Sequence, residues 1–305
     1  MSPWCDCGLF GQLKFPPSTQ YFCPNCYSRK FEKRILNNIP RYIRGHSISV
    51  ALSGGKDSTT MLHILHKYKR KLRITKLIAI ILEEETPEIQ QPRKRVINQL
   101  KSSYSTVSFI QKSYSELFDY SLPSLIHQSD KQGLRYTPCT ICGVLRRHGI
   151  MRLALDNKAD YIALGNTLED EAETILLNIL RGNPWKIYRD KIKYTSADGK
   201  SLPLRIKPLS KVSENTISKY SKINHLQFLN VRCIFAERSF RSEITSFLSI
   251  IGEKDPRILY NIISSIKNET KRKAQVELVH RCSLCSSYSP EIKCSACRII
   301  QKIMT

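Results

Sequence analysis

ISVALSGGKDS, from Ile48 to Ser58, is the stretch that decides the fold of this 305-residue chain. An apolar run, Ile48 to Leu52, is followed by two glycines and then by apolar residues at helical spacing, Met61, Leu62 and Leu65. The pattern predicts a buried strand, a tight turn and the start of a helix.

The turn itself, Ser53-Gly54-Gly55-Lys56-Asp57-Ser58, has the chemistry of a phosphate site. Adjacent glycines let backbone N–H groups approach an anion, the helix N-terminus adds partial positive charge, and Lys56 with two hydroxyl residues completes the cradle. The spacing is not that of the usual P-loop, G-x-x-x-x-G-K-S/T. It resembles instead the SGGxDS loop of ATP pyrophosphatases, enzymes that split ATP into AMP and pyrophosphate to activate a carbonyl or carboxylate oxygen. A Ser/Gly turn without a ligand is the alternative.

Composition points to a polyanionic partner. The chain has 49 Lys and Arg residues against 26 Asp and Glu, a formal net charge of +23, and a nucleic acid bound through its phosphates is the simplest explanation. The N-terminus lacks signal-peptide features, and the longest apolar runs, such as Leu77 to Leu82, are too short to span a membrane. We therefore expect a cytoplasmic protein without membrane contacts, whose 11 cysteines are not structural disulfides.

The last four cysteines form two C-x-x-C pairs: Cys282, Cys285, Cys294 and Cys297. Four thiolates at this spacing predict a tetrahedral zinc site, which replaces the core that so short a segment cannot build. Four unrelated free cysteines are the alternative.

The first four cysteines repeat this arrangement with one pair shortened by a residue: Cys5, Cys7, Cys23 and Cys26. They predict a second zinc ribbon. In the alternative, only one of Cys5 and Cys7 binds the metal and the fourth ligand comes from elsewhere.

Three cysteines remain, the pair Cys139 and Cys142 after a proline, and Cys233. They are suited to an iron–sulfur cluster with one iron open to an exogenous ligand. A reactive disulfide or persulfide between one of the pair and Cys233 is equally consistent with the spacing. Buried, inert cysteines are the third possibility.

The order of SGGKDS, PCTICGVLRR, GNTLEDEAETILLNILRGN and the terminal cysteine pairs resembles the TtcA/TtuA family of tRNA 2-thiolation enzymes over nearly the whole chain. Ribbons at both ends favour its TtuA and eukaryotic cytoplasmic branch. The resemblance implies a PP-loop ATP pyrophosphatase fold, ATP with Mg²⁺, two Zn²⁺ ions, and a 4Fe-4S cluster on Cys139, Cys142 and Cys233. It also implies tRNA and a thiocarboxylated ubiquitin-like sulfur carrier as partners, and a homodimer or a heterodimer with a related subunit.

The segment after the predicted strand at 160–165 departs from the family pattern GHNxDD. Asn166, Thr167 and Glu169 replace the usual histidine, asparagine and first aspartate, whereas Gly165 and Asp170 match. By resemblance, Gly165 and Asp170 belong to the ATP site, and Asp170 manages magnesium or a proton near the reacting carbonyl. The alternative is that acids in the first turn of a helix simply suit its dipole.

Two further positions carry weaker expectations. Arg146 matches a basic family position and is expected to neutralise charge on the adenylate; a surface arginine is the alternative. Glu83-Glu84-Glu85 stands where the family commonly has Asp-Glu-Gly, so the carboxylates are kept and the glycine is lost.

Two basic stretches are candidate RNA contacts. The first contains Lys69, Arg70 and Lys71; the second interleaves Lys186, Arg189 and Lys191 with Trp185, Tyr188 and Tyr194. Cations for phosphates beside aromatic planes for unstacked bases are typical of single-stranded RNA binding. Solvated loops are the alternative for each.

Alternating strands and helices predict an α/β fold with a doubly wound parallel sheet. The clearest strands are expected at 47–52, 74–82, 106–111 and 160–165, with a final strand at 227–232 delivering Cys233. A helix after Asp255 is expected to brace the terminal ribbon. The predicted domains are an N-terminal zinc ribbon (1–30), the ATP pyrophosphatase domain (31–254), and the bracing helix with the C-terminal zinc ribbon (255–305).

The expected function is adenylation of the C2 oxygen of a tRNA uridine and its replacement by sulfur. By the resemblance, sulfur reaches the cluster's open iron from the carrier protein or as free sulfide. A persulfide-based sulfurtransferase without a cluster and a non-catalytic tRNA-binding subunit are the competing hypotheses. Both the wobble uridine and a T-loop uridine stay open as the target.

Overall fold

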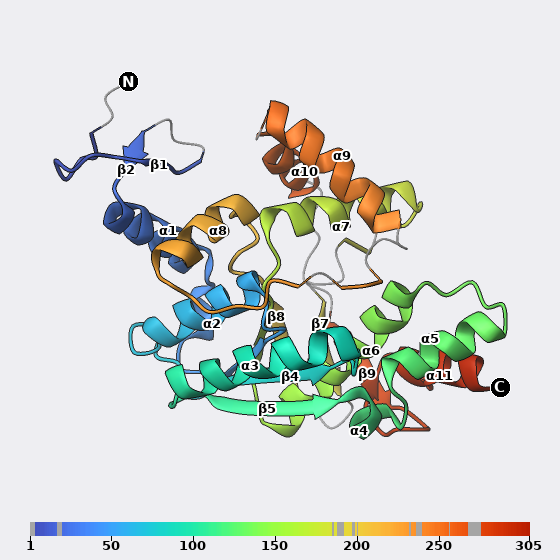
Figure 1. Cartoon of the computed structure of the whole chain (residues 1–305). Helices are drawn as coiled ribbons and strands as arrows, with labels where there is room; N and C mark the ends of the chain where they lie inside the picture. Colours follow the sequence, from blue (N-terminus) through green and yellow to red (C-terminus); the bar gives the residue numbers. More distant parts are fainter. Residues whose placement is uncertain are drawn as a thin grey trace.

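A five-stranded parallel sheet forms the centre of the protein (Figure 1). In sheet order its strands are β5 (Ser108–Ser113), β4 (Leu77–Glu83), β3 (Ile48–Ala51), β6 (Tyr161–Ala163) and β8 (Leu204–Ile206). The computed structural model describes every residue except 1–3, 17–19, 185, 188–191, 197–198, 200, 232, 236–239, 256 and 268–275. The four strands expected at 47–52, 74–82, 106–111 and 160–165 are all present in this sheet.

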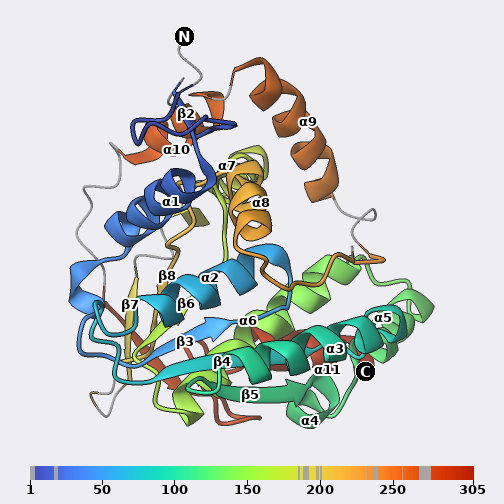
Figure 2. The ribbon, with the colours of Figure 1, turned by 60° about the vertical axis from the view of Figure 1, so that its left-hand side comes forward.

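Helices cover both faces of the sheet because its central strands are apolar on both sides (Figure 2). In β4, Leu77, Ala79 and Ile81 face one helical layer, whereas Ile78 and Ile80 face the other. The first layer is α1 (Pro24–Asn38), α2 (Lys56–Lys67), α3 (Pro87–Ser103) and α8 (Glu214–Ile223); the second is α6 (Pro138–Asp156). A strand buried on both faces forms a continuous apolar run in the sequence. The predicted doubly wound α/β fold is confirmed.

The C-terminal cysteine group packs beside α6, together with short helices from the middle of the chain. These helices are α4 (Tyr114–Phe118), α5 (Leu122–Lys131) and the last helix, α11 (Ser295–Met304). The strand β9 (Val276–Arg281) pairs antiparallel with β10 (Tyr288–Ser289) and parallel with β7 (Lys193–Ser196). A strand from the connection after α7 (Leu168–Leu180) therefore anchors the C-terminal segment.

The N-terminal cysteine group precedes α1 and is tied to the main core. An antiparallel pair of two-residue strands, β1 (Leu13–Lys14) and β2 (Tyr21–Phe22), leads into that helix. Cys5 and Cys23 are buried in the same apolar cluster as Tyr27 of α1. A short 3₁₀ helix, η1 (Arg41–Ile43), then connects α1 to β3.

The predicted bracing helix packs elsewhere than expected. It is α10 (Arg257–Lys267), and with α9 (Phe240–Lys254) it lies on α7, away from the C-terminal segment (Figure 1). Leu248 and Leu259 share a buried cluster with Leu168 of α7. The expectation is wrong because α11 already supplies an apolar face beside the C-terminal cysteines. In the described part of the chain, no helix is both long and apolar enough to cross a membrane.

The expected strand at 227–232 is also wrong. Within its described residues, pairing is limited to one bridge between Leu229 and Gly55, and Leu229 N donates to Gly54 O at 2.7 Å. The sheet ends at β8, so this segment instead pairs with the loop after β3. As predicted, the chain after this segment leads to Cys233.

Candidate active site and metal centres

The Ser53–Ser58 loop joins the carboxyl end of β3 to the first turn of α2. Gly54 has a φ of +84°, a left-handed conformation that favours glycine. Gly55 is the N-cap of α2 and makes no side-chain capping bond. The Oγ atoms of Ser53 and Ser58 lie 3.0 Å apart and brace the turn. Because no side chain caps this helix end, its first N–H groups can donate hydrogen bonds to phosphate oxygens.

The turn after β6 lies directly against this loop. A Cβ atom on Gly165 would lie 3.1 Å from Ser58 N and 3.3 Å from the carbonyl carbon of Asp57, so only glycine allows this approach. β3 and β6 are neighbours in the sheet, and the chain crosses to opposite sides from them, to β4 and to β8. This is the topological switch point at which open α/β sheets bind ligands. The turn after β6 and the PP-loop therefore lie together at the carboxyl ends of the strands.

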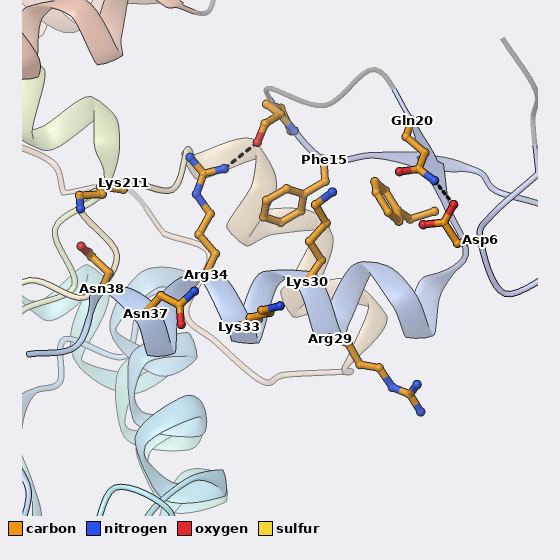
Figure 3. Close-up of a pocket in the computed structure, with 12 residues that line it drawn as sticks. Asp6, Phe15, Gln20, Arg29, Lys30, Lys33, Arg34, Asn37, Asn38 and Lys211 are labelled. Carbon is orange, nitrogen blue, oxygen red and sulfur yellow. Dashed lines mark hydrogen bonds between the residues drawn. The ribbon is translucent and has the colours of Figure 1, made fainter. Parts of the chain in front are cut away.

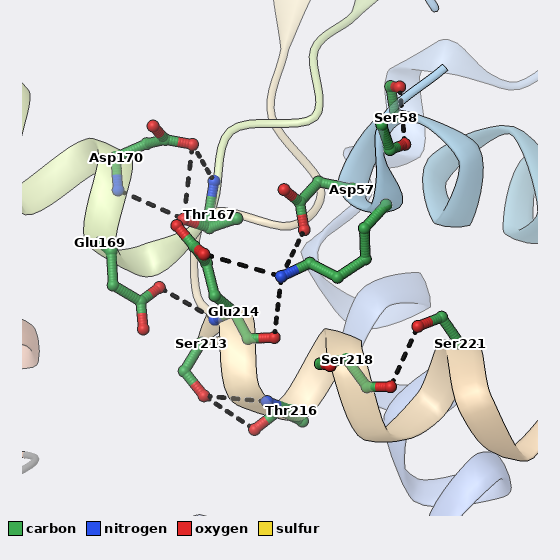
Figure 4. A network of polar contacts seen from close by, with 12 residues as sticks. Asp57, Ser58, Thr167, Glu169, Asp170, Ser213, Glu214, Thr216, Ser218 and Ser221 are labelled. Atoms are coloured by element: carbon green, nitrogen blue, oxygen red, sulfur yellow. Dashed lines mark hydrogen bonds and ion pairs between the residues drawn. The ribbon is translucent and has the colours of Figure 1, made fainter. Parts of the chain in front are cut away.

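Carboxylates gather beside the PP-loop, from Asp57, Glu169, Asp170 and Glu214 (Figure 4), and Lys56 contacts two of them. Its Nζ lies 3.7 Å from Asp57 Oδ1 and 3.6 Å from Glu214 Oε2. Burial raises the pKa of Asp57 to about 6 against the opposing effect of Lys56, and the carboxylates of Glu214 and Asp170 raise it further. Asp57 Oδ1 is buried and has no hydrogen-bond partner among the described residues. The Asp57 carboxylate is therefore suited to bind a further cation, such as the metal ion of a bound polyphosphate.

Asp170 is a helix-capping residue in this structure. Its Oδ2 accepts from Thr167 N at 3.0 Å and completes a capping box at the start of α7. Its Oδ1 accepts from Arg241 at 3.1 Å. Beside it, burial raises the pKa of Glu169 to about 7, and Glu169 Oε2 accepts from Glu214 N at 3.0 Å. Asp170 thus has a local structural role in addition to its proximity to Asp57.

Arg146 is half-exposed and forms an ion pair with Glu84. Glu84 is buried and also pairs with Arg93 of α3, and the two arginines keep its pKa low despite burial. Glu85 adopts a φ of +59° and accepts from Ser115 N at 2.9 Å. The loss of the family glycine at this position therefore leaves a strained glutamate whose carboxylate caps the start of α4.

Cys139, Cys142 and Cys233 converge at the N-terminus of α6. Cys139 Sγ lies 3.7 Å from the carbonyl oxygen of Phe235, two residues beyond Cys233. Burial raises the pKa of Cys142, and the charge of Cys233 contributes to this rise. Cys139 and Cys233 are exposed and Cys142 is partly buried. Two of the three thiols are therefore accessible to solvent.

The terminal cysteines form two compact groups. In each group the four sulfurs lie within 4.8 Å of one another, Cys5, Cys7, Cys23 and Cys26 in one and Cys282, Cys285, Cys294 and Cys297 in the other. This geometry suits a tetrahedral metal ion, and it includes both Cys5 and Cys7. His148 of α6 approaches the C-terminal group, with Nε2 3.8 Å from Cys294 Sγ and 3.9 Å from Cys285 Sγ.

Known proteins are similar to this chain in sequence and in fold. The sequence profile of the PP-loop domain family matches residues 27–242. The chain belongs to the PP-loop domain family. It is 30% identical over 303 residues to the cytoplasmic tRNA 2-thiolation protein 1 of Drosophila virilis, covering 97% of this chain and 86% of that protein. It is 29% identical over 304 residues to the protein of that name from Drosophila erecta, with the same coverage.

A solved structure has the same fold as this PP-loop protein. The U34-tRNA thiolase NcsA from Methanococcus maripaludis, determined with its 4Fe-4S cluster, superimposes with a TM-score of 0.81 at 21% sequence identity. The match covers 99% of this chain and 97% of that one. The likeness extends beyond the PP-loop domain to the segments that carry both terminal cysteine groups.

The predicted RNA-binding stretches are distant from the PP-loop or incompletely described. Lys69, Arg70 and Lys71 follow the far end of α2, a helix about 18 Å long. Lys186 is exposed, whereas Arg189 and Lys191 lie outside the described residues. The first stretch would therefore contact a part of an RNA remote from the phosphate loop.

Sequence reasoning missed three residues of the PP-loop site and its surroundings. Glu214 and Arg241 reach the site from α8 and α9, and His148 reaches the C-terminal cysteines from α6. The signal available for Glu214 was its position after Ser213, a helix N-cap. Nothing local to the sequence pairs Arg241 or His148 with partners so far along the chain.

Proposed function

We propose that this protein is an ATP-dependent tRNA uridine 2-sulfurtransferase of the cytoplasm. The observation that carries the proposal is the path of the segment after α8. Leu229 pairs with the PP-loop at Gly55, and Cys233 follows four residues later, two residues before Phe235, whose carbonyl oxygen lies 3.7 Å from Cys139 Sγ. Four extended residues span at most about 14 Å, which limits the distance from the bridge at Leu229 to Cys233.

In the first step, the C2 oxygen of the uridine attacks the α-phosphorus of ATP and pyrophosphate leaves. The start of α2 and Lys56 stabilise the phosphate charge, since both direct positive charge toward the loop. Asp57 and Asp170 would hold Mg²⁺, because oxygen ligands suit that ion and Asp57 Oδ1 lacks a hydrogen-bond partner within the described structure. The step is required because a carbonyl oxygen is a poor leaving group.

In the second step, sulfide adds at C2 and AMP leaves with the original oxygen, so that no oxidant or reductant is consumed. A 4Fe-4S cluster, when bound by Cys139, Cys142 and Cys233, would supply sulfide at its fourth iron. Cys139 and Cys233 are exposed, which leaves this side open to the incoming base. Arg146, half-exposed beside Glu84, would neutralise the adenylate phosphate. We also propose the thiocarboxylated ubiquitin-like carrier as sulfur donor, and assembly as a homodimer or with a related subunit.

Two variants test this function. Lys56→Ala should abolish AMP formation with tRNA and leave the zinc content unchanged, because Lys56 belongs to neither terminal cysteine group. Cys233→Ala should lose iron and 2-thiouridine formation while retaining ATP binding. Iron bound undiminished by Cys233→Ala would contradict this ligand assignment, and thiolation by native protein that contains no iron would support the persulfide mechanism. Absence of tRNA-dependent AMP formation by the native protein would support a non-catalytic subunit.

A further inference from the structure

A basic cavity of about 900 Å³ lies between α1 and the N-terminal hairpin, outside the catalytic site (Figure 3). Its polar lining comes mainly from one face of α1 and from the loop after β8: Arg29, Lys30, Lys33, Arg34, Asn38 and Lys211. Among the described lining residues, Asp6 is the one carboxylate, and that group accepts from Gln20. Five cations thus face the cavity against a single acid.

Two of these cations are held in place by packing. Lys30 Nζ lies 4.1 Å from the centre of the Phe22 ring. Arg34 donates to Pro16 O at 2.7 Å and to Tyr260 Oη at 2.9 Å. Arg29 and Lys33 are exposed one helical turn apart on the same helix. The charges therefore form a partly preorganised row, about 14 Å long from Arg29 to Asn38.

The row ends next to the catalytic site. Asn38 Nδ2 donates to Pro208 O at 2.8 Å and fixes the loop after β8 to the end of α1. This loop continues through Lys211 to Glu214, which contacts Lys56 in the PP-loop. A chain lying along α1 would be directed at the edge of the sheet where ATP is proposed to bind.

We infer that this cavity binds the phosphate backbone of the RNA whose uridine enters the catalytic site, an inference that rests on the proposed function. The chemistry favours phosphates over an acidic protein surface. Protein interfaces are enriched in exposed aromatic anchors, whereas Phe15 and Phe22 at this cavity are only 2% and 5% exposed and Lys30 covers the latter ring. Contacts of this kind position an RNA without reading its sequence.

The test is direct binding of an unmodified tRNA transcript to the full-length metal-loaded protein, measured by fluorescence anisotropy from 50 to 200 mM salt. The double variant Arg29→Glu/Lys33→Glu should raise the Kd about 10-fold or more, and Arg29→Gln/Lys33→Gln should lower the slope of log affinity against log salt by about 1.5. Both side chains are exposed, so folding, iron, zinc and ATP binding should be unchanged.

Lys76→Glu/Lys158→Glu is the matched control, with the same charge change at exposed positions beside the opposite ends of the strands. It should change the Kd less than 2-fold. Equal tRNA affinity of the α1 variant and the native protein would overturn the inference and leave an acidic protein as the occupant. Selective loss of binding in the α1 variant supports it, even if the native protein forms no thiouridine and the proposed function fails.

Discussion

At the scale of single residues, burial sets the ionisation of the catalytic site. Asp57 and Glu169 both have a raised pKa, about 6 and about 7, because each is largely removed from water. Their charged forms are costly without a cation nearby. A metal ion bound beside Asp57 and Glu169 would therefore favour their ionised forms. Lys56 is the cation closest to Asp57 in the loop.

Glu169→Gln should stabilise the ligand-free protein, and more so at higher pH. A raised folded pKa means that the stability contributed by neutral Glu169 is present below about pH 4.5 and is lost as the pH rises through about 7. The gain in unfolding free energy should grow by roughly 1–2 kcal/mol between pH 5.5 and 8. Denaturant titrations at both pH values measure it, with exposed Glu253→Gln as control. An equal gain at both pH values would contradict the assignment.

Single residues were predictable where the chemistry is local. Gly54 and Lys56 belong to one short motif, and the structure gives them the left-handed turn and the helix start that the motif requires. Glu214 and Arg241 were missed because their partners lie 158 and 71 residues away along the chain. Only the tertiary fold brings such groups together.

At the scale of elements, the site depends on two turns in backbone contact. The turn after β6 is pressed against the first residues of α2, and Gly165 is the point of closest approach. The backbone of Ser58 cannot rotate away as a flexible side chain would, so the loop and this turn must move together.

Gly165→Ala should therefore raise the Kd for ATP about 10-fold, because the added methyl group would displace the start of α2 from its phosphate-binding geometry. Isothermal titration with ATP and Mg²⁺ measures the change. Gly252→Ala in α9 is the matched control, since its Cβ would meet Leu259 at an ordinary 3.7 Å. Unchanged ATP affinity in Gly165→Ala would show that the two turns are not coupled.

Elements were predictable where one pattern dominates the sequence. The apolar run of β4 and the helical spacing of α2 are strong local signals, and both elements are present. The segment at 227–232 has strand-like composition, but the sheet ends at β8 and the described part of the segment pairs with the loop after β3 instead. The packing partner of α10 was predicted wrongly because an amphipathic helix does not specify which surface it covers.

At the scale of the whole molecule, the terminal cysteine groups extend the core rather than hang from it. Cys282 and Cys294 are buried with Ile299 and Ile303 of α11, against α5 and α6. β9 is paired with β7 in the middle of the chain. Loss of a metal ion at this end should therefore reach the main domain.

Cys294→Ser should lower the zinc content from two ions per chain to one and lower the Tm by several degrees, because a structural zinc site contributes folding free energy. Metal analysis with thermal unfolding measures both effects. Cys233→Ala is the control: Cys233 is exposed, so this variant should lose iron yet keep both zinc ions and its Tm. Two zinc ions retained in Cys294→Ser would contradict the proposed ligand set.

Helix α6 carries Cys139, Cys142 and Arg146 near its start, and His148 meets Cys285 and Cys294 two residues later. Helix α6 thus joins the proposed cluster ligands to the C-terminal cysteine group, whereas the PP-loop leads into a different helix, α2. Oxidants or chelators that strip the ribbon should uncouple the two halves of the reaction, so that ATP is still consumed while the base stays unmodified. Loss of the metal ion at the C-terminal cysteines would then stop thiolation before it stops ATP consumption.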